Sequence, residues 1–317
     1  MKTKTIEIND IQMGILFSII NKLLYPVDKL ISFSELETII SDYTFNNQSY
    51  SFPYLFFVDK PLVDSIICLY NGNYFCTIDV ESYYYIDLNW YCKKTFNTDD
   101  INHPGVAYIQ TNKDKICVSG CITDYNKDVV NNINIPYIHT DINNIEYVFQ
   151  SRNPPHRIHQ KIIETYAPNL VYSFPYISVK QDDYSFNKRL QCYEYIKDKY
   201  NIKLLCTLLP RMLAGPREAL QNMILFKNYG FKYFIFGRGK NSVGNYYNDD
   251  DGYKICKQYE SKLGINIIYT GSQSIHGEVI RASDIKHMYI DKGLYPPEDI
   301  MDPKIADILL KEESTDV

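Results

Sequence analysis

The stretch YVFQSRNPPHRIH, residues 147–159, decides the fold that we expect for this chain. Its opening apolar run predicts a short buried strand, and Asn153 can cap a helix whose first turn begins at Pro154. His156 and His159 are three residues apart, so they would share one face of that turn. The free N–H groups and the positive dipole end of such a helix form an anion site.

Apolar runs and helix-like segments alternate after this stretch. The strand-like runs cover residues 147–149, 170–174, 204–209, 233–236 and 265–269. The helix-like segments begin near Pro154, Phe186, Pro216 and Asp250. Strands that are separated by crossover helices predict an α/β domain with a parallel sheet covered on both faces. Such sheets bind ligands at the carboxyl ends of their strands, where the motif QSRNPPHRIH lies.

The N-terminal part of the chain lacks this alternation. We expect an amphipathic helix over Ile11–Leu24 and then β-rich segments, with turn signals such as Asn71-Gly72-Asn73 between them. These segments are SIICLY (65–70), YFCTIDV (74–80), GVAYIQT (105–111) and KICVSGCI (115–122). The pattern predicts a compact, mainly β domain over residues 1–143, ending in an Asn- and Asp-rich linker at 124–144. The α/β domain would then occupy residues 144–317, with a small helical segment at its end.

Composition excludes several classes of function. The chain is 45% hydrophobic and 22% charged, as folded globular proteins are. A net charge of −5 argues against a general nucleic-acid binder. No apolar run approaches the roughly 18 residues of a membrane span, and the N-terminus lacks the apolar core of a signal peptide. We therefore expect a cytoplasmic protein with no nucleic-acid or membrane partner.

The chain carries no clear metal-binding pattern. Its eight cysteines are scattered, and the nearest pair, Cys117 and Cys121, has no second pair or nearby His to complete a zinc site. Reduced, buried thiols are expected instead. The carboxylates of residues 249–251 are interpreted as a solvated helix start, so no protein metal site is predicted.

Two segments have the residue types that phosphate and oxyanion chemistry needs. In the first, two imidazoles can donate hydrogen bonds to a triphosphate, and Arg152 can hold an oxyanion with its planar guanidinium. In the second, AGPREA (214–219) opens a helix after a strand, and Gly230 is the expected end of that helix.

Both segments resemble signatures of the ATP sulfurylase family. QSRNPPHRIH is similar to its Gln-Thr-Arg-Asn-Pro-x-His-x-x-His motif, with Ser151 in the Thr position. AGPREA followed by KNYGFKYFIFGR (227–238) is similar to its AGPREA…KNxGxxHFIxGR block. Weaker landmarks keep the family order, namely HPGVA (103–107), KQDD (180–183) with Arg189, and YPP (295–297).

The resemblance implies a Rossmann-like nucleotidyltransferase domain that is preceded by a PUA-like domain. It also implies adenylyl transfer from ATP to sulfate, with Mg²⁺ bound to the nucleotide. Catalytic roles then fall on Arg152, Asn153, His156 and His159, and oxyanion contacts on Gln150, Arg152 and Arg217. Nucleotide contacts fall on His156, His159, Gly237, Arg238, Ser283 and Lys286.

The sequence departs from the family in the loop after Gly237-Arg238. The family continues with Asp-His-Ala-Gly, whereas this chain has Gly-Lys-Asn-Ser at 239–242. Lys240 adds a cation near the expected pocket and is therefore included among the substrate-binding residues. Ser283 and Lys286 stand where the family has Thr and Arg, and Lys cannot make the bidentate contact of Arg. The arginine ahead of AGPREA is displaced to Arg211.

Three functions remain open at this point. ATP and a small oxyanion are the expected partners, with sulfate favoured because Gln150 and Arg152 are both present. A nucleotidyltransferase with a phosphorylated acceptor is the first alternative, since Lys240 would favour the extra negative charge. A non-catalytic, nucleotide-binding regulatory protein is the second. The oligomeric state is also left open, with a homo-oligomer among the alternatives.

Overall fold

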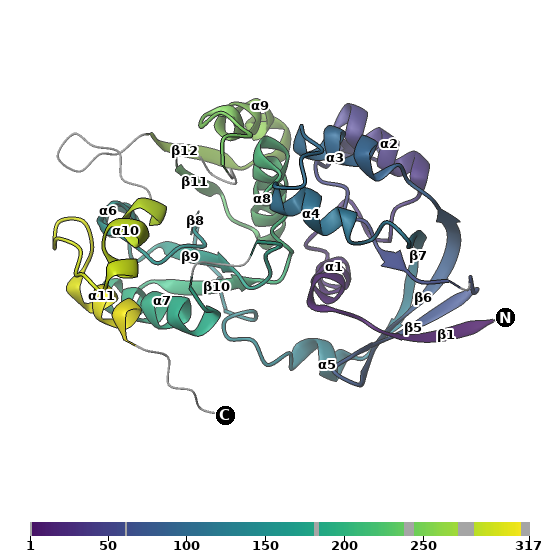
Figure 1. Ribbon diagram of the computed structural model, residues 1–317, viewed down its shortest axis with the longest axis horizontal. Helices are drawn as coiled ribbons and strands as arrows, with labels where there is room; N and C mark the ends of the chain where they lie inside the picture. The colour runs from purple at the N-terminus through teal and green to yellow at the C-terminus, as the bar shows by residue number, and fades with distance from the viewer. Residues whose placement is uncertain (1, 61, 181–183, 238–243, 272–281, 312–317) are drawn as a thin grey trace.

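The described residues form two five-stranded sheets, each with its own helices, which lie side by side (Figure 1). The computed structural model describes residues 2–60, 62–180, 184–237, 244–271 and 282–311, without the side chain of Ser283. Within these ranges, every helix is too short or too polar to span a bilayer.

The first sheet has mixed strand directions. β1 pairs in parallel with β5, and the other pairs are antiparallel. In spatial order its strands are β1 (Thr3–Glu7), β5 (Ser65–Tyr70), β6 (Asn73–Tyr84), β7 (Ile116–Tyr125) and β4 (Phe57–Val58). The predicted turn joins β5 to β6 through Asn71 and Gly72, both with positive φ, as tight hairpins require. A small hairpin of β2 (Thr44–Phe45) and β3 (Gln48–Ser49) lies apart.

Helices contribute more to this domain than the sequence pattern predicted. They are α1 (Asp10–Ile20), α2 (Phe33–Asp42), α3 (Leu88–Phe96), α4 (Pro104–Gln110) and α5 (Lys127–Asn131). The expected strand GVAYIQT is wrong, because this segment is α4. Pro104 fits its first turn, and the His103 side chain caps it by accepting hydrogen bonds from two backbone N–H groups.

The expected amphipathic helix is instead a central, buried one. All residues from Met13 to Ile19 in α1 are buried, as in a helix that is enclosed on every side. Gly14 allows this packing, since a Cβ there would lie 2.1 Å from the carbonyl oxygen of Leu208 in the second domain. The N-terminal helix is therefore part of the contact between the domains.

The second sheet is entirely parallel, as predicted. In spatial order its strands are β10 (Lys203–Thr207), β9 (Leu170–Pro175), β8 (Tyr147–Gln150), β11 (Tyr233–Gly237) and β12 (Asn266–Gly271). The chain adds β9 and β10 on one side of β8 and then returns to add β11 and β12 on the other. The strand order thus reverses between β8 and β11, and open α/β sheets bind ligands outside the carboxyl ends at such a point.

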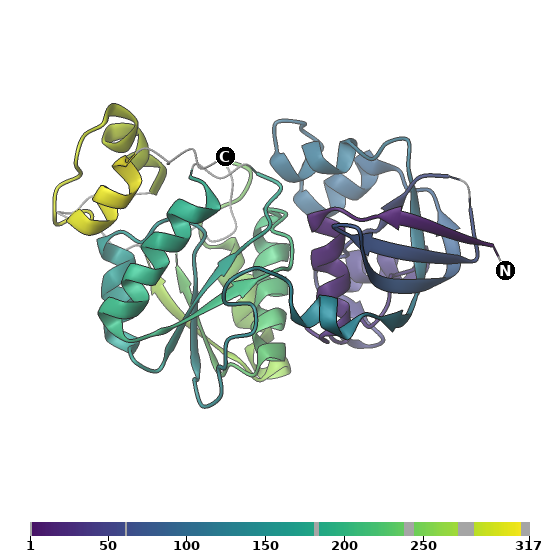
Figure 2. The ribbon, with the colours of Figure 1, turned by 90° about the horizontal axis from the view of Figure 1, so that it is seen from below.

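Helices cover both faces of this sheet, as Figure 2 shows. Those on one face are α6 (Arg157–Tyr166) and α7 (Phe186–Tyr200), and those on the other are α8 (Gly215–Tyr229) and α9 (Asp251–Leu263). Alternate residues of a strand point to opposite faces of the sheet. Val148 therefore belongs to the hydrophobic cluster on the α8–α9 face, and its neighbour Phe149 belongs to the cluster on the other face. The short helices α10 (Ala282–Met288) and α11 (Pro303–Leu310) follow, and α11 packs on α7.

The segment between the domains is not a free linker. After α5 it runs along the outer edge of β10, where the backbone N–H of Cys206 donates to the carbonyl oxygen of Tyr137 at 3.0 Å. The side chain of Lys203 also donates to the carbonyl of Asp141. These contacts cover part of an edge strand that would otherwise present unpaired backbone groups.

Buried polar contacts join α8 to the N-terminal domain. Arg217 donates to the carbonyl oxygens of Ile39, Ile40 and Ser51 at 2.7–3.2 Å, and it is 6% exposed. One turn later, the Gln221 side-chain oxygen accepts from the backbone N–H groups of residues 51 and 52. The substrate-binding role expected for Arg217 does not fit these surroundings, because its guanidinium points into the domain interface.

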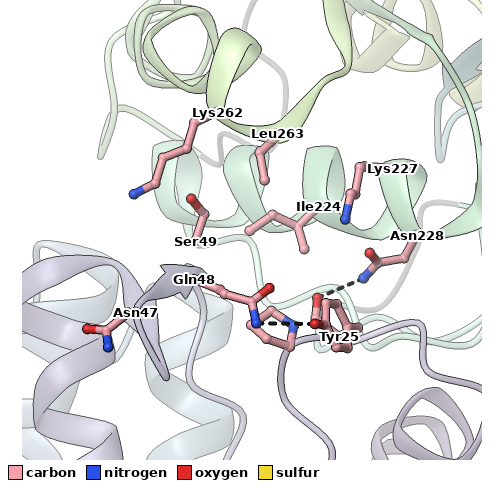
Figure 3. Close-up of a pocket in the computed structure, with 10 residues that line it drawn as sticks. Tyr25, Asn47, Gln48, Ser49, Ile224, Lys227, Asn228, Lys262 and Leu263 are labelled. Carbon is pink, nitrogen blue, oxygen red and sulfur yellow. Dashed lines mark hydrogen bonds between the residues drawn. The ribbon is translucent and has the colours of Figure 1, made fainter.

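A pocket of about 220 Å³ opens elsewhere along this interface (Figure 3). Lys227 and Lys262 reach it from α8 and α9, while Gln48 and Ser49 approach from the β2–β3 hairpin. None of the expected substrate-binding residues that the structure describes lines this pocket.

We predict that Arg217→Ala lowers the free energy of unfolding by about 3 kcal/mol or more, because three buried carbonyls lose a charged donor. Urea unfolding of the whole chain measures this loss. Lys227→Ala, on the same helix, is the matched control and should change stability by less than about 0.5 kcal/mol. Equal stability of Arg217→Ala and the wild type would contradict the structural role.

Candidate functional site

The carboxyl end of β8 presents a buried amide. Gln150 is 4% exposed, and its side-chain oxygen accepts from the guanidinium of Arg211 at 3.4 Å. Its Nε2 donor has no hydrogen-bond partner among the residues that the structure describes. Burying such a donor without a partner is costly, so a ligand acceptor at this place would remove a penalty.

Two imidazoles stack at the start of α6, where the sequence had predicted only that they share one face of its first turn. The rings of His156 and His159 are 4.0 Å apart between centroids and 28° from parallel. His156 is the N-cap residue and His159 lies in the first turn. Both rings therefore lie beside the N–H groups at the helix start, which favour an anion.

The helix begins three residues later than predicted. α6 starts at Arg157 with His156 as its cap, so the expectation that Asn153 caps a helix starting at Pro154 is wrong. The cause is the pair Pro154-Pro155, because a residue that precedes a proline is driven out of the helical region. Asn153 and Pro154 both precede prolines.

Burial sets the charge of His156. The residue is 5% exposed, although a helix mouth suggested a more open position. Its Nδ1 has no hydrogen-bond partner within the described part of the chain. Desolvation lowers the pKa of His156 to about 4, so the ring is neutral near pH 7.

The turn that carries Arg152 and Asn153 is fixed through its backbone. The carbonyl oxygen of Arg152 accepts from the Tyr193 hydroxyl at 2.9 Å and from Arg189 at 3.4 Å. The backbone N–H of Asn153 donates to the Ser151 hydroxyl at 3.2 Å. These contacts hold the turn through backbone atoms of Arg152 and Asn153. Arg152 itself is partly exposed.

Arg211 is a site residue that the sequence analysis missed. It is 5% exposed, and its Nε lies 3.2 Å from Glu218, which also accepts the backbone N–H of Met212 at 2.8 Å. Through Gln150, the same guanidinium links the start of α8 to the end of β8. Two signals were available, namely a charged residue in the otherwise apolar run LLPRMLAG (208–215) and its place next to the position where the resembled family has an arginine ahead of AGPREA.

The structure describes some of the other residues that were predicted to bind nucleotide or substrate, and leaves others out. Gly237 ends β11, the strand next to β8 at the point where the strand order reverses. Lys286 pairs with Asp291 and lies 5.9 Å from the ring centroid of Tyr184, so it would bind phosphate only in competition with a carboxylate. Arg238, Lys240 and the side chain of Ser283 lie outside the described residues.

The described site offers hydrogen-bond donors around the carboxyl ends of β8 and β10, together with the buried guanidinium of Arg211. Gln150 and the two imidazoles can donate to oxygen atoms, while Arg211, which is paired with Glu218, holds the Gln150 side-chain oxygen. No group of three or more His, Cys, Asp and Glu side chains is placed to hold a metal ion among the residues that the structure describes. The arrangement suits an oxyanion and a polyphosphate held at a helix start.

Known proteins share this architecture. A family model described as a PUA-like domain matches residues 1–127. A hexameric APS kinase from Thiobacillus denitrificans has the same fold with a TM-score of 0.65, over 97% of this chain, at 12% sequence identity. This chain covers 62% of that protein's length.

Sequence relatives include sulfate adenylyltransferases. A sulfate adenylyltransferase of Persephonella marina is 28% identical over 90% of this chain and 85% of its own length. Another, from Staphylothermus marinus, is 31% identical over 78% of this chain and 72% of its own length. A model described as ATP-sulfurylase matches residues 143–312, more than half of the chain. The chain therefore belongs to the ATP-sulfurylase family of nucleotidyltransferases.

Proposed function

We propose that this chain transfers the adenylyl group of ATP to sulfate, giving adenosine 5'-phosphosulfate and pyrophosphate. The observation that supports this most is the convergence of the Gln150 amide, the Arg152 turn and the stacked pair His156–His159 at the reversal point of the sheet. Relatives that are named sulfate adenylyltransferases support the choice of sulfate.

In the proposed reaction, a sulfate oxygen attacks the α-phosphorus of ATP in line. A bond forms between that oxygen and phosphorus, while the bond from the α-phosphorus to the bridging oxygen breaks. Pyrophosphate leaves with the electron pair. Gln150 and Arg152 hold the sulfate, and His156 and His159 donate to phosphate oxygens, so that positioning and electrostatics lower the barrier.

Mg²⁺ would enter with the nucleotide. The described residues provide no carboxylate cage for it, and Mg²⁺ at nucleotide sites is commonly held by phosphates and water. We therefore assign no protein ligand to the ion. Its contribution when bound would be to neutralise phosphate charge.

Resemblance and sequence position add further contacts to this proposal. The nucleotide contacts are completed by Arg238, Ser283 and Lys286, and the acceptor contacts are completed by Lys240. The Gly-Lys-Asn-Ser segment at 239–242 is where the acceptor preference would change if it differs from the family's. A cation there suits a phosphorylated acceptor as well as sulfate, so the acceptor has to be measured.

The first prediction concerns the acceptor. Purified protein with ATP and Mg²⁺ should release pyrophosphate with sulfate faster than with phosphorylated acceptors at equal concentration. Lys240→Ala should raise the sulfate KM and change ATP binding less. Faster pyrophosphate release with a phosphorylated acceptor would show that this compound, and not sulfate, is the acceptor. Tight ATP binding in calorimetry without any turnover would favour a regulatory role.

The second prediction concerns Arg152. Arg152→Ala should lower turnover by roughly 100-fold or more, because a bidentate anion partner is lost, while the ATP Kd changes by less than about threefold. Single-turnover kinetics and calorimetry separate the two effects. Lys161→Ala, an exposed position on α6, is the control. Near-normal turnover of Arg152→Ala at low sulfate would show that the assignment is wrong.

The third prediction uses the depressed pKa of His156. Between pH 6.5 and about 4 the unfolded chain binds a proton that the folded chain does not, so this group's contribution to stability is complete above 6.5 and is lost as the pH falls towards 4. The loss should reach about 3 kcal/mol. His156→Gln should remove this component from urea unfolding curves measured across the window.

Exposed His139 provides the control, and His139→Gln should keep the wild-type dependence. The same dependence in His156→Gln as in the wild type would show that His156 is not the buried neutral group. Because a triphosphate beside the ring favours its charged form, ATP binding should also take up protons below neutral pH. Calorimetry in buffers of different ionisation enthalpy measures that uptake.

A further inference from the structure

His103 is a buried histidine of the N-terminal domain that contacts two segments of the other domain. It is 0% exposed. Its Nδ1 accepts from the backbone N–H groups of Gly105 and Val106 at 3.1 and 3.3 Å. The ring proton must therefore sit on Nε2, which lies 3.2 Å from the Leu213 carbonyl oxygen and 3.1 Å from the Tyr247 hydroxyl.

The first segment is the turn that leads into α8. Leu213 has a φ of +62°, a left-handed conformation that a bulky residue rarely adopts, and Gly215 follows with +53°. Such a backbone persists only where its surroundings hold it. Gly105 brings the N-terminal domain close enough to do so, since a Cβ there would lie 2.4 Å from the Met212 carbonyl oxygen.

The second segment is residues 244–250, which lead into α9 and which we call the return segment. The Tyr247 hydroxyl donates to the carbonyl of Phe96 at 3.0 Å and accepts from His103. Its ring covers Gly215 so closely that a Cβ there would meet it at 2.4 Å. Tyr247 thus joins the return segment both to the start of α8 and to the N-terminal domain.

The turn held by His103 continues directly into the candidate site. The Met212 backbone N–H donates to Glu218, Glu218 pairs with Arg211, and Arg211 donates to Gln150. A shift of the 212–215 turn would therefore move the guanidinium that orients the Gln150 amide.

We infer that His103 is a positioning residue for adenylyl transfer. From the N-terminal domain it holds the Leu213 turn and Tyr247, and through that turn it fixes the oxyanion side of the site. The inference rests on the proposed function for its catalytic consequence. It gives the N-terminal domain a part in the reaction although, in the proposed site, that domain provides no substrate contact.

The test uses substitutions that keep the local fold. His103→Asn retains a side-chain oxygen that can cap α4, but it is too short to reach Leu213 and Tyr247. Tyr247→Phe keeps the ring on Gly215 and removes only the hydroxyl. Tyr246→Phe is the matched control, since it loses a bond to Asp100 on the exposed side of the same segment.

In pyrophosphate-release assays, His103→Asn should lower kcat/KM for sulfate by roughly tenfold or more, because small misplacements of a held reactant are costly. The ATP KM should stay within about threefold of the wild type. Tyr247→Phe should show a smaller loss, the double variant should resemble His103→Asn alone, and Tyr246→Phe should match the wild type. Wild-type kinetics in His103→Asn would overturn the inference.

Hydrogen exchange separates this inference from the proposed function. In His103→Asn, peptides that cover residues 212–215 and 246–248 should exchange faster than in the wild type, and in Tyr246→Phe they should not. If the wild type releases no pyrophosphate, the adenylyl-transfer proposal fails, and faster exchange still supports the positioning contact. Unchanged exchange in His103→Asn would overturn that contact whatever the kinetics show.

Discussion

Arg211 and Glu218 meet at 3.2 Å in the interior between β8 and α8, where both side chains are almost fully buried. Two charges withdrawn from water are stable only when further hydrogen bonds satisfy them. Here one carboxylate oxygen of Glu218 also accepts the Met212 N–H, and Arg211 reaches Gln150, while the other oxygen has no hydrogen-bond partner among the described residues. The pair therefore fixes the end of one strand, a turn and the start of a helix relative to one another, and the candidate site is built on those three elements.

The parallel domain could be predicted closely because its physics is local and periodic. Each apolar strand run agrees with an observed strand to within about two residues, and Phe186 and Pro216 mark the starts of α7 and α8. The spacing of His156 and His159 placed them on one face, but their ring stacking was not predicted. The burial of His156 was not predicted either, because exposure at a helix mouth depends on what the rest of the chain places there.

The errors arose where one segment's role depends on a distant partner. Arg217 has the sequence context of a ligand contact, yet backbone carbonyls about 170 residues earlier in the chain bind its guanidinium. GVAYIQT has the composition of a strand, but the capping histidine and Pro104 favour a helix. Arg211 was not assigned to the site for the same reason, since its contacts with Gln150 and Glu218 are visible only in the folded chain.

The contact between Tyr137 and the edge of β10 also bears on how the chain avoids self-association while it folds. The segment with Tyr137 is synthesised before Cys206, so the backbone groups that will cover this edge are already present when β10 emerges. Open strand edges of partly folded chains pair with one another and aggregate. The segment between the domains can thus cover part of this edge as soon as β10 has been made.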